Sequence, residues 1–324
     1  MNPEGFLADV LAEPETLRTV AAAYADARLL DELPSAGPVL FLGMGSSRFA
    51  AGACATALRA RGIDAYAEHA STGQPQPPSP DTLCVAVSAG GGSRETLSAL
   101  ARHAGTSRTV AVTNRVDSEL ATACDLVLPL HAGEEAGGVA SRTYHATVAV
   151  LQLLAARIAG DEPEPVLDRV RRAADVLEEV LAARAAWLPE LVEAVGRGPV
   201  YIAAPAERLA SAEQAALMLR EGPRIEADAC ETGDWSHVDV YLSKHPGYRL
   251  LLLGGSAWEA ELLEWVRARG CTLVAVGRPA AGAALQIPFE HADDRELAAL
   301  VETTPVELLA WSLWTASGHG HAAA

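Results

Sequence analysis

The chain has 324 residues, of which 50% are hydrophobic and 21% charged, and its formal net charge at pH 7 is −17. Length and composition fit two domains with cores of their own, and the acidic balance argues against nucleic-acid binding, which requires clustered lysine and arginine. No apolar run reaches the roughly 18 residues of a membrane span and no signal peptide opens the chain, so we expect a cytoplasmic protein.

The first 36 residues are predicted to be helical. Leu7, Val10, Leu11, Leu17 and Val20 recur at helical spacing, with polar residues between them. We interpret residues 1–36 as an N-terminal arm that packs across a domain or onto a partner subunit.

From residue 38 to about residue 160, apolar runs alternate with helical patterns. The predicted strands are residues 39–42, 63–67, 83–87, 109–112 and 126–130, and the predicted helices are residues 50–61, 94–104, 118–124 and 141–158. Such alternation indicates βαβ units and a mainly parallel five-stranded sheet with helices on both faces, as in flavodoxin-like and Rossmann-like domains.

The second half of the chain repeats the first. Residues 200–208, 250–256, 272–277 and 285–289 echo residues 39–48, 83–90, 110–114 and 126–130, and the offset stays near ~160–170 residues, as a duplicated α/β unit requires. A charged amphipathic helix joins the two. The predicted organisation is an arm (1–36), a first domain (37–160), a helical linker (161–196) and a second domain (197–324).

The first strand leads into a candidate anion site. After residues 39–42 come Gly43 and Gly45, then Ser46 and Ser47 where a helix begins. Backbone N–H groups at a helix start favour an anion, and the hydroxyls can donate to phosphate oxygens. The dinucleotide fingerprint lacks its third glycine and only Glu68 could hold a ribose, so we predict a phosphomonoester site rather than an NAD site. A tight turn without a ligand is the alternative.

Two further segments open helices at the same predicted edge of the sheet. The candidate ligand-binding residues in them are Ser88, Gly90, Gly91, Ser93 and Thr96 in the first, and Val139, Ala140 and Ser141 in the second. Ordinary turn chemistry, with Ser93 as a helix N-cap, is the alternative for the glycine-rich loop.

The second domain offers candidate acid–base residues instead of glycines. Glu221 ends a predicted helix before Gly222, and Asp234 and His237 follow shortly after. A carboxylate near a histidine suits proton transfer at a carbon next to a carbonyl. Without further evidence, a solvated helix end for Glu221 and a structural role for His237 are better supported than an acid–base pair.

The cysteines point to a reduced protein without a metal site. Five cysteines are widely spaced, with no Cys-x-x-Cys pair. We expect most of them to be reduced core residues, and we expect neither a metal nor a cofactor.

These segments together resemble the sugar isomerase (SIS) family, over about residues 35–318. The likeness is greatest to the isomerase half of the glutamine–fructose-6-phosphate aminotransferases. Gly45, Ser46 and Ser47 resemble its Gly-Thr-Ser phosphate turn, residues 88–96 its Ser-Gln-Ser-Gly-Glu-Thr loop, and residues 139–141 its Val-Ala-Ser helix start. The resemblance implies two tandem SIS units.

The resemblance also implies catalytic roles. It makes Glu221 the base that moves a proton between C1 and C2 of the sugar, and His237 the ring-opening histidine, which in the family comes from the neighbouring subunit of a homodimer. Asp234 is then placed to orient His237.

Several family features are missing from this sequence. There is no glutaminase domain and no cysteine near the N-terminus, the imine-forming C-terminal lysine has no counterpart, and the lysine after Val-Ala-Ser is absent. The phosphate loop lacks the family's Gln and second Ser, and Ser93 stands where the family has Thr. We therefore expect no glutamine amidotransferase activity.

The sequence thus predicts an enzyme that removes the C2 proton of an amino-sugar or hexose 6-phosphate. Elimination by a lyase or dehydratase on glucosamine or N-acetylglucosamine 6-phosphate is favoured, because the imine lysine and the ammonia source are missing. Isomerisation or deamination is the alternative. A non-catalytic sugar-phosphate sensor is a third hypothesis, although the 36 residues before the first strand are too few and too acidic for a helix-turn-helix domain.

Overall fold

The computed structural model describes residues 1–26, 28–33 and 37–317. The tail that the sequence predicts beyond Gly318 lies outside these residues. Two compact units make up the described chain. We call them the first-sheet unit (Glu15–Glu134 and Arg142–Arg171) and the second-sheet unit (Met1–Pro14, Glu135–Ser141 and the chain from Arg172 onward).

The first-sheet unit contains a five-stranded, all-parallel sheet. Its strands are β1 (Val39–Gly43), β2 (Ala65–His69), β3 (Leu83–Val87), β4 (Arg108–Thr113) and β5 (Leu126–Pro129). They lie in the order β2-β1-β3-β4-β5, and every neighbouring pair is parallel. This is the flavodoxin order, in which ligands bind beyond the carboxyl ends of the strands where the order reverses, here at β1 and β3.

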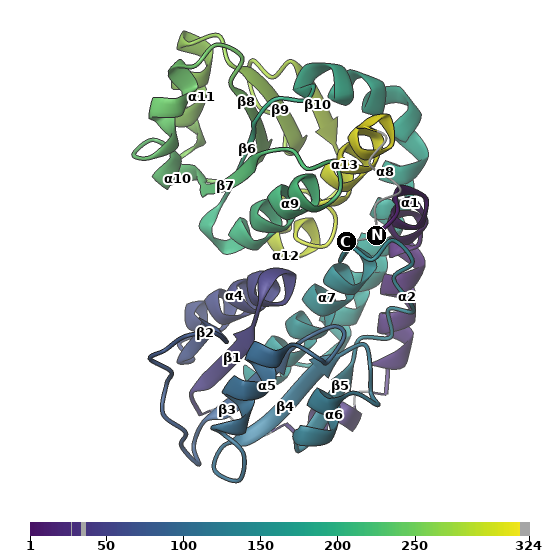
Figure 1. Cartoon of the computed structure of the whole chain (residues 1–324), viewed down its shortest axis with the longest axis vertical. Helices are drawn as coiled ribbons and strands as arrows, with labels where there is room; N and C mark the ends of the chain where they lie inside the picture. Colours follow the sequence, from purple (N-terminus) through teal and green to yellow (C-terminus); the bar gives the residue numbers. More distant parts are fainter. Residues whose placement is uncertain (27, 34–36, 318–324) are drawn as a thin grey trace. The chain divides into compact units, whose positions relative to one another are not determined.

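Helices cover both faces of the first sheet (Figure 1). The chain moves from β1 to β2 in one direction and from β3 to β4 in the other, so right-handed crossovers put the connecting helices on opposite faces. On one face α4 (Gly45–Ala60) packs against α7 (Arg142–Ile158), and on the other α5 (Arg94–Ala101) packs beside α6 (Glu119–Ala123). The short helix α3 (Arg28–Asp31) packs on α7.

The second-sheet unit repeats this topology. Its strands are β6 (Val200–Ala204), β7 (Ala227–Glu231), β8 (Arg249–Leu253), β9 (Thr272–Gly277) and β10 (Leu285–Pro288). Their order, β10-β9-β8-β6-β7, is that of the first sheet read from the other edge, and all neighbours are parallel. The predicted fold class, two tandem α/β units each with a parallel five-stranded sheet, is confirmed.

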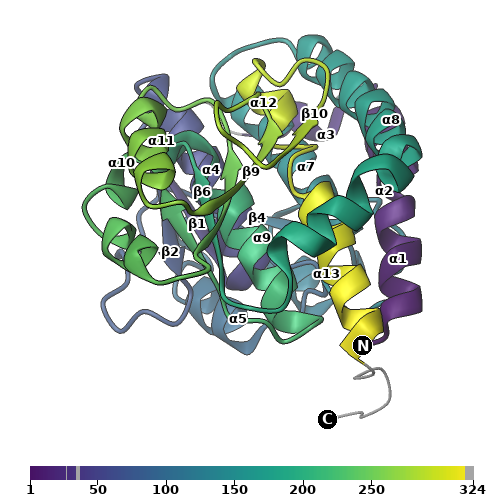
Figure 2. The ribbon, with the colours of Figure 1, turned by 90° about the horizontal axis from the view of Figure 1, so that it is seen from above.

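Helices from both ends of the chain belong to the second-sheet unit. They are α1 (Pro3–Leu11), α9 (Leu209–Glu221), α10 (Thr232–Trp235), α11 (Glu259–Ala268), α12 (Arg295–Ala298) and α13 (Thr304–Ser317), with the 3₁₀ turns η1 (Ala206–Arg208) and η2 (Asp239–Lys244). Helices α1 and α13 lie side by side (Figure 2), with the rings of Phe6 and Trp314 6.0 Å apart between centroids. Helices α2 (Glu13–Ala23) and α8 (Glu164–Val195) each contribute residues to both units.

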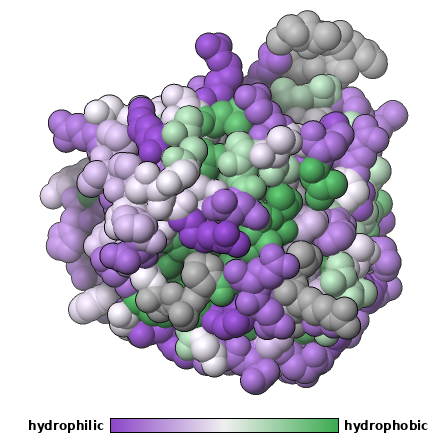
Figure 3. Space-filling model, turned by 90° about the horizontal axis from the view of Figure 1, so that it is seen from below, coloured by the Kyte–Doolittle hydropathy of each residue, from purple (hydrophilic) through white to green (hydrophobic). Residues whose placement is uncertain are grey.

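The cysteines are reduced as predicted, but only two of the five are fully buried. All five cysteines are free thiols, and Cys54 and Cys84 are buried. On the face drawn in Figure 3, hydrophilic residues surround a smaller area of hydrophobic ones. Within the described ranges, no helix combines the length and apolar character that crossing a membrane requires.

Candidate functional site

The turn between β1 and α4 leaves a helix start open to an anion. Met44 is the N-cap residue of α4, but no side chain caps this end and its first turn contains no acidic residue. Gly45 adopts a φ of +51°, which glycine tolerates and most residues do not. Ser46 and Ser47 are half-buried in the first turn. Uncapped N–H groups, the helix dipole and two hydroxyls therefore meet at this point.

The glycine-rich loop between β3 and α5 is tightly built. Gly91 has a φ of +66°, and a Cβ there would lie only 2.1 Å from the Ser118 hydroxyl oxygen. The Gly91 N–H bonds the Ser88 carbonyl at 3.0 Å, which closes the turn. Only glycine fits this position, so the loop conformation is fixed by sterics. Ser88 and the exposed Gly90 remain at its surface.

Ser93 acts as a helix cap. Its hydroxyl oxygen accepts hydrogen bonds from the Thr96 backbone N–H (3.3 Å) and from the Thr96 hydroxyl (3.0 Å), and the Ser93 hydroxyl donates to a Glu95 carboxylate oxygen, with 3.2 Å between the two oxygens. Thr96 itself is fully buried. Buried Thr96 thus stabilises the start of α5 through its hydrogen bond to Ser93. The Ser93 hydroxyl serves as the N-cap of this helix.

The starts of α4 and α5 lie at the same edge of the first sheet. Strands β1 and β3 pair directly, with Leu42 opposite Ala86, so their carboxyl ends are neighbours. Ser46, Ser47 and Ser88 come from these two ends. Two helix N-termini with adjacent hydroxyls form an arrangement suited to a phosphate dianion.

In the second-sheet unit, the segment Glu135–Ser141 is fixed by hydrogen bonds at several points. The Asp9 carboxylate accepts the N–H groups of Ala136 (3.1 Å) and Gly137 (2.7 Å). The Gln214 side chain donates to the Ala140 carbonyl at 2.7 Å, and the Ser141 N–H donates to the Glu135 carboxylate at 2.6 Å. The predicted ligand-binding residues Val139, Ala140 and Ser141 therefore have a defined backbone conformation.

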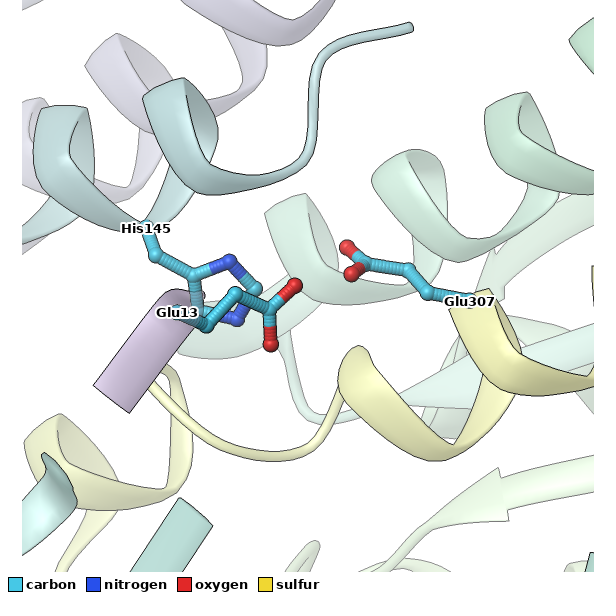
Figure 4. A group of neighbouring side chains, drawn as sticks. All are labelled: Glu13, His145 and Glu307. Carbon is cyan, nitrogen blue, oxygen red and sulfur yellow. The ribbon is translucent and has the colours of Figure 1, made fainter. Parts of the chain in front are cut away.

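The Ser141 side chain is buried against two carboxyl groups. Its hydroxyl oxygen lies 2.8 Å from Glu13 and 3.2 Å from Glu307, whose carboxyl groups point toward one another (Figure 4). The Thr304 hydroxyl donates to Glu13 at 2.7 Å. Burial raises the pKa of Glu13, and one hydroxyl proton cannot serve two carboxylates. A proton held by the carboxyl pair satisfies this geometry.

Glu221 is a half-buried carboxylate at the end of α9. The helix ends here because Gly222 and Pro223 follow, and a Cβ at Gly222 would meet the Trp314 ring at 2.9 Å. Burial raises the pKa of Glu221, the Glu135 carboxylate raises it further, and Arg220 lowers it. A carboxyl group with a raised pKa is a better proton acceptor near neutral pH than an exposed one.

We expect the Glu221 carboxyl to titrate above 4.5, its ordinary value, and to titrate lower in a Glu135→Gln variant. The glutamine keeps an oxygen for the Ser141 N–H but removes a negative charge near Glu221. The measurement is a carbon-13 NMR titration of side-chain carboxyls, assigned with Glu221→Gln.

Glu134→Gln is the matched control, because it removes the same charge one residue away. An unchanged or higher midpoint for Glu221 in Glu135→Gln would show that Glu135 does not act on this carboxyl.

Asp234 and His237 lie in an exposed turn after β7. The Glu231 carboxylate caps α10 through the Asp234 N–H at 2.9 Å, and the His237 N–H bonds the Asp234 carbonyl at 2.9 Å. Among residues 37–317, the Asp234 carboxylate makes no hydrogen bond to the His237 ring. The link between the two residues is through the backbone, and both side chains are exposed.

Four buried or half-buried residues of this unit were not identified from the sequence. They are Glu13, Glu135, Gln214 and Glu307. Gln214 precedes Glu221 by seven residues, so both lie on one face of α9, and this spacing is a signal that could have been read. The other three are far apart in sequence and show no periodic pattern.

Comparison with known proteins finds a family match in the first half of the chain. Residues 32–157 match the SIS domain family. The glutamine–fructose-6-phosphate aminotransferase of Aeropyrum pernix is 30% identical over 271 residues, which cover 78% of this chain and 44% of that protein. The chain thus spans less than half of the length of such relatives.

Solved structures share the whole fold. The C-terminal domain of glucosamine-fructose-6-phosphate aminotransferase from Francisella tularensis superposes with a TM-score of 0.83 at 16% identity, covering 97% of this chain and 96% of that one. Glucosamine-6-phosphate deaminase from Thermotoga maritima gives a TM-score of 0.76 at 20% identity, covering 97% and 95%. Residues 32–157 therefore form a SIS domain, and the chain is similar over most of its length to a glutamine–fructose-6-phosphate aminotransferase and in fold to the C-terminal domain of another.

Proposed function

We propose that this protein is an enzyme that converts hexose or amino-sugar 6-phosphates by removing the proton on C2. The first-sheet unit anchors the phosphate, and Glu221 is the base. The observation that carries the proposal is the Glu221 carboxyl itself, half-buried, with a raised pKa, at the end of α9.

The phosphate is bound by the backbone at Gly45, Gly90 and Gly91 and by the hydroxyls of Ser46, Ser47 and Ser88. Ser93 and Thr96 hold the start of α5 in place. Val139, Ala140 and Ser141 contribute backbone groups, because the Ser141 hydroxyl is bonded to Glu13 and Glu307. This division of roles follows from which side chains are already engaged within their own unit.

The reaction begins with the open-chain sugar, for which His237 assists ring opening and Asp234 helps to hold the turn. Glu221 takes the C2 proton, and the electrons of that bond form an enediol or enolamine. If the nitrogen is acylated, the electrons expel the C3 hydroxyl, which takes the proton from Glu221 and leaves as water. If the amine is free, C1 is reprotonated, and hydrolysis of the resulting C2 imine releases ammonia.

A lysine imine has no place in this mechanism. Lys244 is the single lysine of the sequence. It lies in η2, is exposed, and its ammonium group stacks over the Tyr241 ring at 5.7 Å. Proton transfer by a carboxylate alone is therefore the chemistry that these residues support.

Product analysis distinguishes the candidate reactions. N-acetylglucosamine 6-phosphate, glucosamine 6-phosphate and fructose 6-phosphate are each incubated with the protein and followed by NMR. We expect an unsaturated, dehydrated product from the first. A ketose and ammonia from glucosamine 6-phosphate would indicate the deaminase or isomerase alternative. Binding of all three without any product would contradict an enzyme and support a sensor.

We also propose that the protein is a homodimer in which His237 serves the site of the neighbouring chain. Large apolar side chains are exposed around the His237 turn, on η2 and α11: Val238 (55%), Tyr241 (65%), Trp258 (67%) and Trp265 (42%). A second copy of the chain would bury these surfaces while presenting the exposed histidine.

Mixing two inactive variants tests this sharing. Glu221→Gln and His237→Ala homodimers are each expected to be inactive, and random exchange of subunits should restore about a quarter of wild-type activity. In half of the dimers one site is then intact and the other carries both changes. No recovery after verified subunit exchange would show that Glu221 and His237 act within one chain.

A further inference from the structure

A hollow on the first-sheet unit is not used by the proposed reaction. It has a volume of about 450 Å³ and is lined by Ala70, Ser71, Arg94, Glu95, Ser98 and Arg102. Arg94, Ser98 and Arg102 follow one another at intervals of four residues, so they share one face of α5 and its C-terminal cap. Ala70 and Ser71 form the opposite wall, just after β2.

The positive charges of the two arginines in the hollow are not paired with a carboxylate. Within the part of the chain that the structure describes, the guanidinium groups of Arg94 and Arg102 form no hydrogen bond and no ion pair. The chain has 42 acidic and 25 basic residues, yet both exposed arginines face this hollow without pairing to a carboxylate among the described residues. Glu95 is the one acidic group in the lining, and the Ser93 hydroxyl donates to it.

The hollow adjoins the phosphate loop. Arg94 directly follows Ser93, the N-cap of α5. On the other wall, the Ala70 N–H bonds the Gly43 carbonyl at the end of β1, at 3.2 Å. The same two elements that frame the phosphate site, the end of β1 and the start of α5, therefore also frame the hollow.

We propose that this hollow is a second anion subsite, which binds a phosphate or carboxylate carried by the sugar phosphate itself. Guanidinium groups bind both anions through paired N–H donors, and the Ser71 and Ser98 hydroxyls can add further donors. The substrate class is then a hexose 6-phosphate with a second acidic group. This inference deepens the proposed function and depends on it for the first phosphate only.

The test compares ligands with one and two phosphates by isothermal titration calorimetry. Fructose 6-phosphate, fructose 1,6-bisphosphate and inorganic phosphate are titrated into the wild type and into Arg94→Gln and Arg102→Gln. On the wild type the bisphosphate should bind at least about tenfold more tightly than the monophosphate, which is about 1.4 kcal/mol. Each arginine variant should reduce this ratio several-fold and leave the affinity for fructose 6-phosphate within about twofold.

Arg61→Gln is the matched control, because Arg61 is an exposed arginine of the same unit that pairs with Asp161 at 2.6 Å. It should leave the ratio unchanged. If the bisphosphate binds no more tightly than the monophosphate, or if the arginine variants keep the wild-type ratio, the subsite is overturned. If no compound binds, it is overturned as well.

Two further outcomes distinguish a free anion from an anion carried by the substrate, and the anion subsite from the proposed phosphate site. Arginine-dependent binding of inorganic phosphate in the presence of saturating fructose 6-phosphate would show that the subsite takes a free anion, and would overturn its assignment to the substrate. Arginine-dependent binding of the bisphosphate that survives Ser46→Ala and Ser47→Ala would support the subsite and contradict the proposed phosphate site.

Discussion

Replacing Glu221 by glutamine is expected to lower kcat by about 10²–10⁴-fold, the usual contribution of a general base. The amide has nearly the same shape as the carboxyl but cannot accept the C2 proton. Because the phosphate is held by other residues, the dissociation constant of the sugar phosphate should stay within about tenfold of the wild-type value, or about 1.4 kcal/mol. Single-turnover kinetics and equilibrium binding on the same preparation measure the two quantities.

Glu226→Gln provides the control for this variant. Glu226 is an exposed glutamate five residues further along the chain, and its replacement removes the same charge. We expect wild-type kcat from it. A Glu221→Gln enzyme that turns over at the wild-type rate would remove Glu221 from the role of base, whatever the affinity for substrate.

Replacing Glu302 by alanine is expected to destabilise the second-sheet unit by about 3–5 kcal/mol. Glu302 and Arg208 form an ion pair in which both side chains are almost fully buried, with 1% and 5% of their surface exposed. Arg208 also donates to the Gly254 carbonyl at the end of β8. Without Glu302, the guanidinium charge stays buried with no opposite charge beside it.

Tryptophan fluorescence during urea unfolding measures this loss selectively. All six tryptophans lie between residues 187 and 314, so their fluorescence reports on the second-sheet unit. Asp293→Ala, which breaks the exposed pair between Arg278 and Asp293 of the same unit, should cost no more than about 1 kcal/mol. A loss of under about 1 kcal/mol for Glu302→Ala would contradict the role given to the buried pair.

Local patterns were sufficient to predict every strand of the two sheets except β7, because the half-exposed segment Ala227–Glu231 contains no apolar run. The run at residues 39–42 is buried on both faces in β1 and the run at residues 83–87 in β3, because parallel strands covered by helices on both sides are apolar throughout. The repeat along the chain predicted the second sheet, since the same order of apolar runs builds the same strand order. The helix after β1 begins at Gly45 instead of near residue 50, because its first turn is glycine and serine rather than an apolar pattern.

The candidate site was only partly predictable, because its decisive contacts join distant parts of the chain. The burial of Ser141 depends on Glu13 and Glu307, which are 128 and 166 residues away. No local pattern marks the two carboxyl groups as partners. Ser93 was predictable by contrast, because its contacts are local. Its place directly before a predicted helix already suggested that it could be the N-cap residue.

Deuterium exchange at C2 shows most directly whether this protein removes the C2 proton. Glucosamine 6-phosphate and N-acetylglucosamine 6-phosphate are incubated in D₂O with the wild type and with Glu221→Gln, and the C2 proton signal is followed by NMR. We predict, with the wild type alone, deuterium at C2 of the recovered substrate or a product that has lost the C2 proton. A C2 proton that is never exchanged by the wild type, with bound substrate verified by calorimetry, would contradict proton abstraction at this carbon.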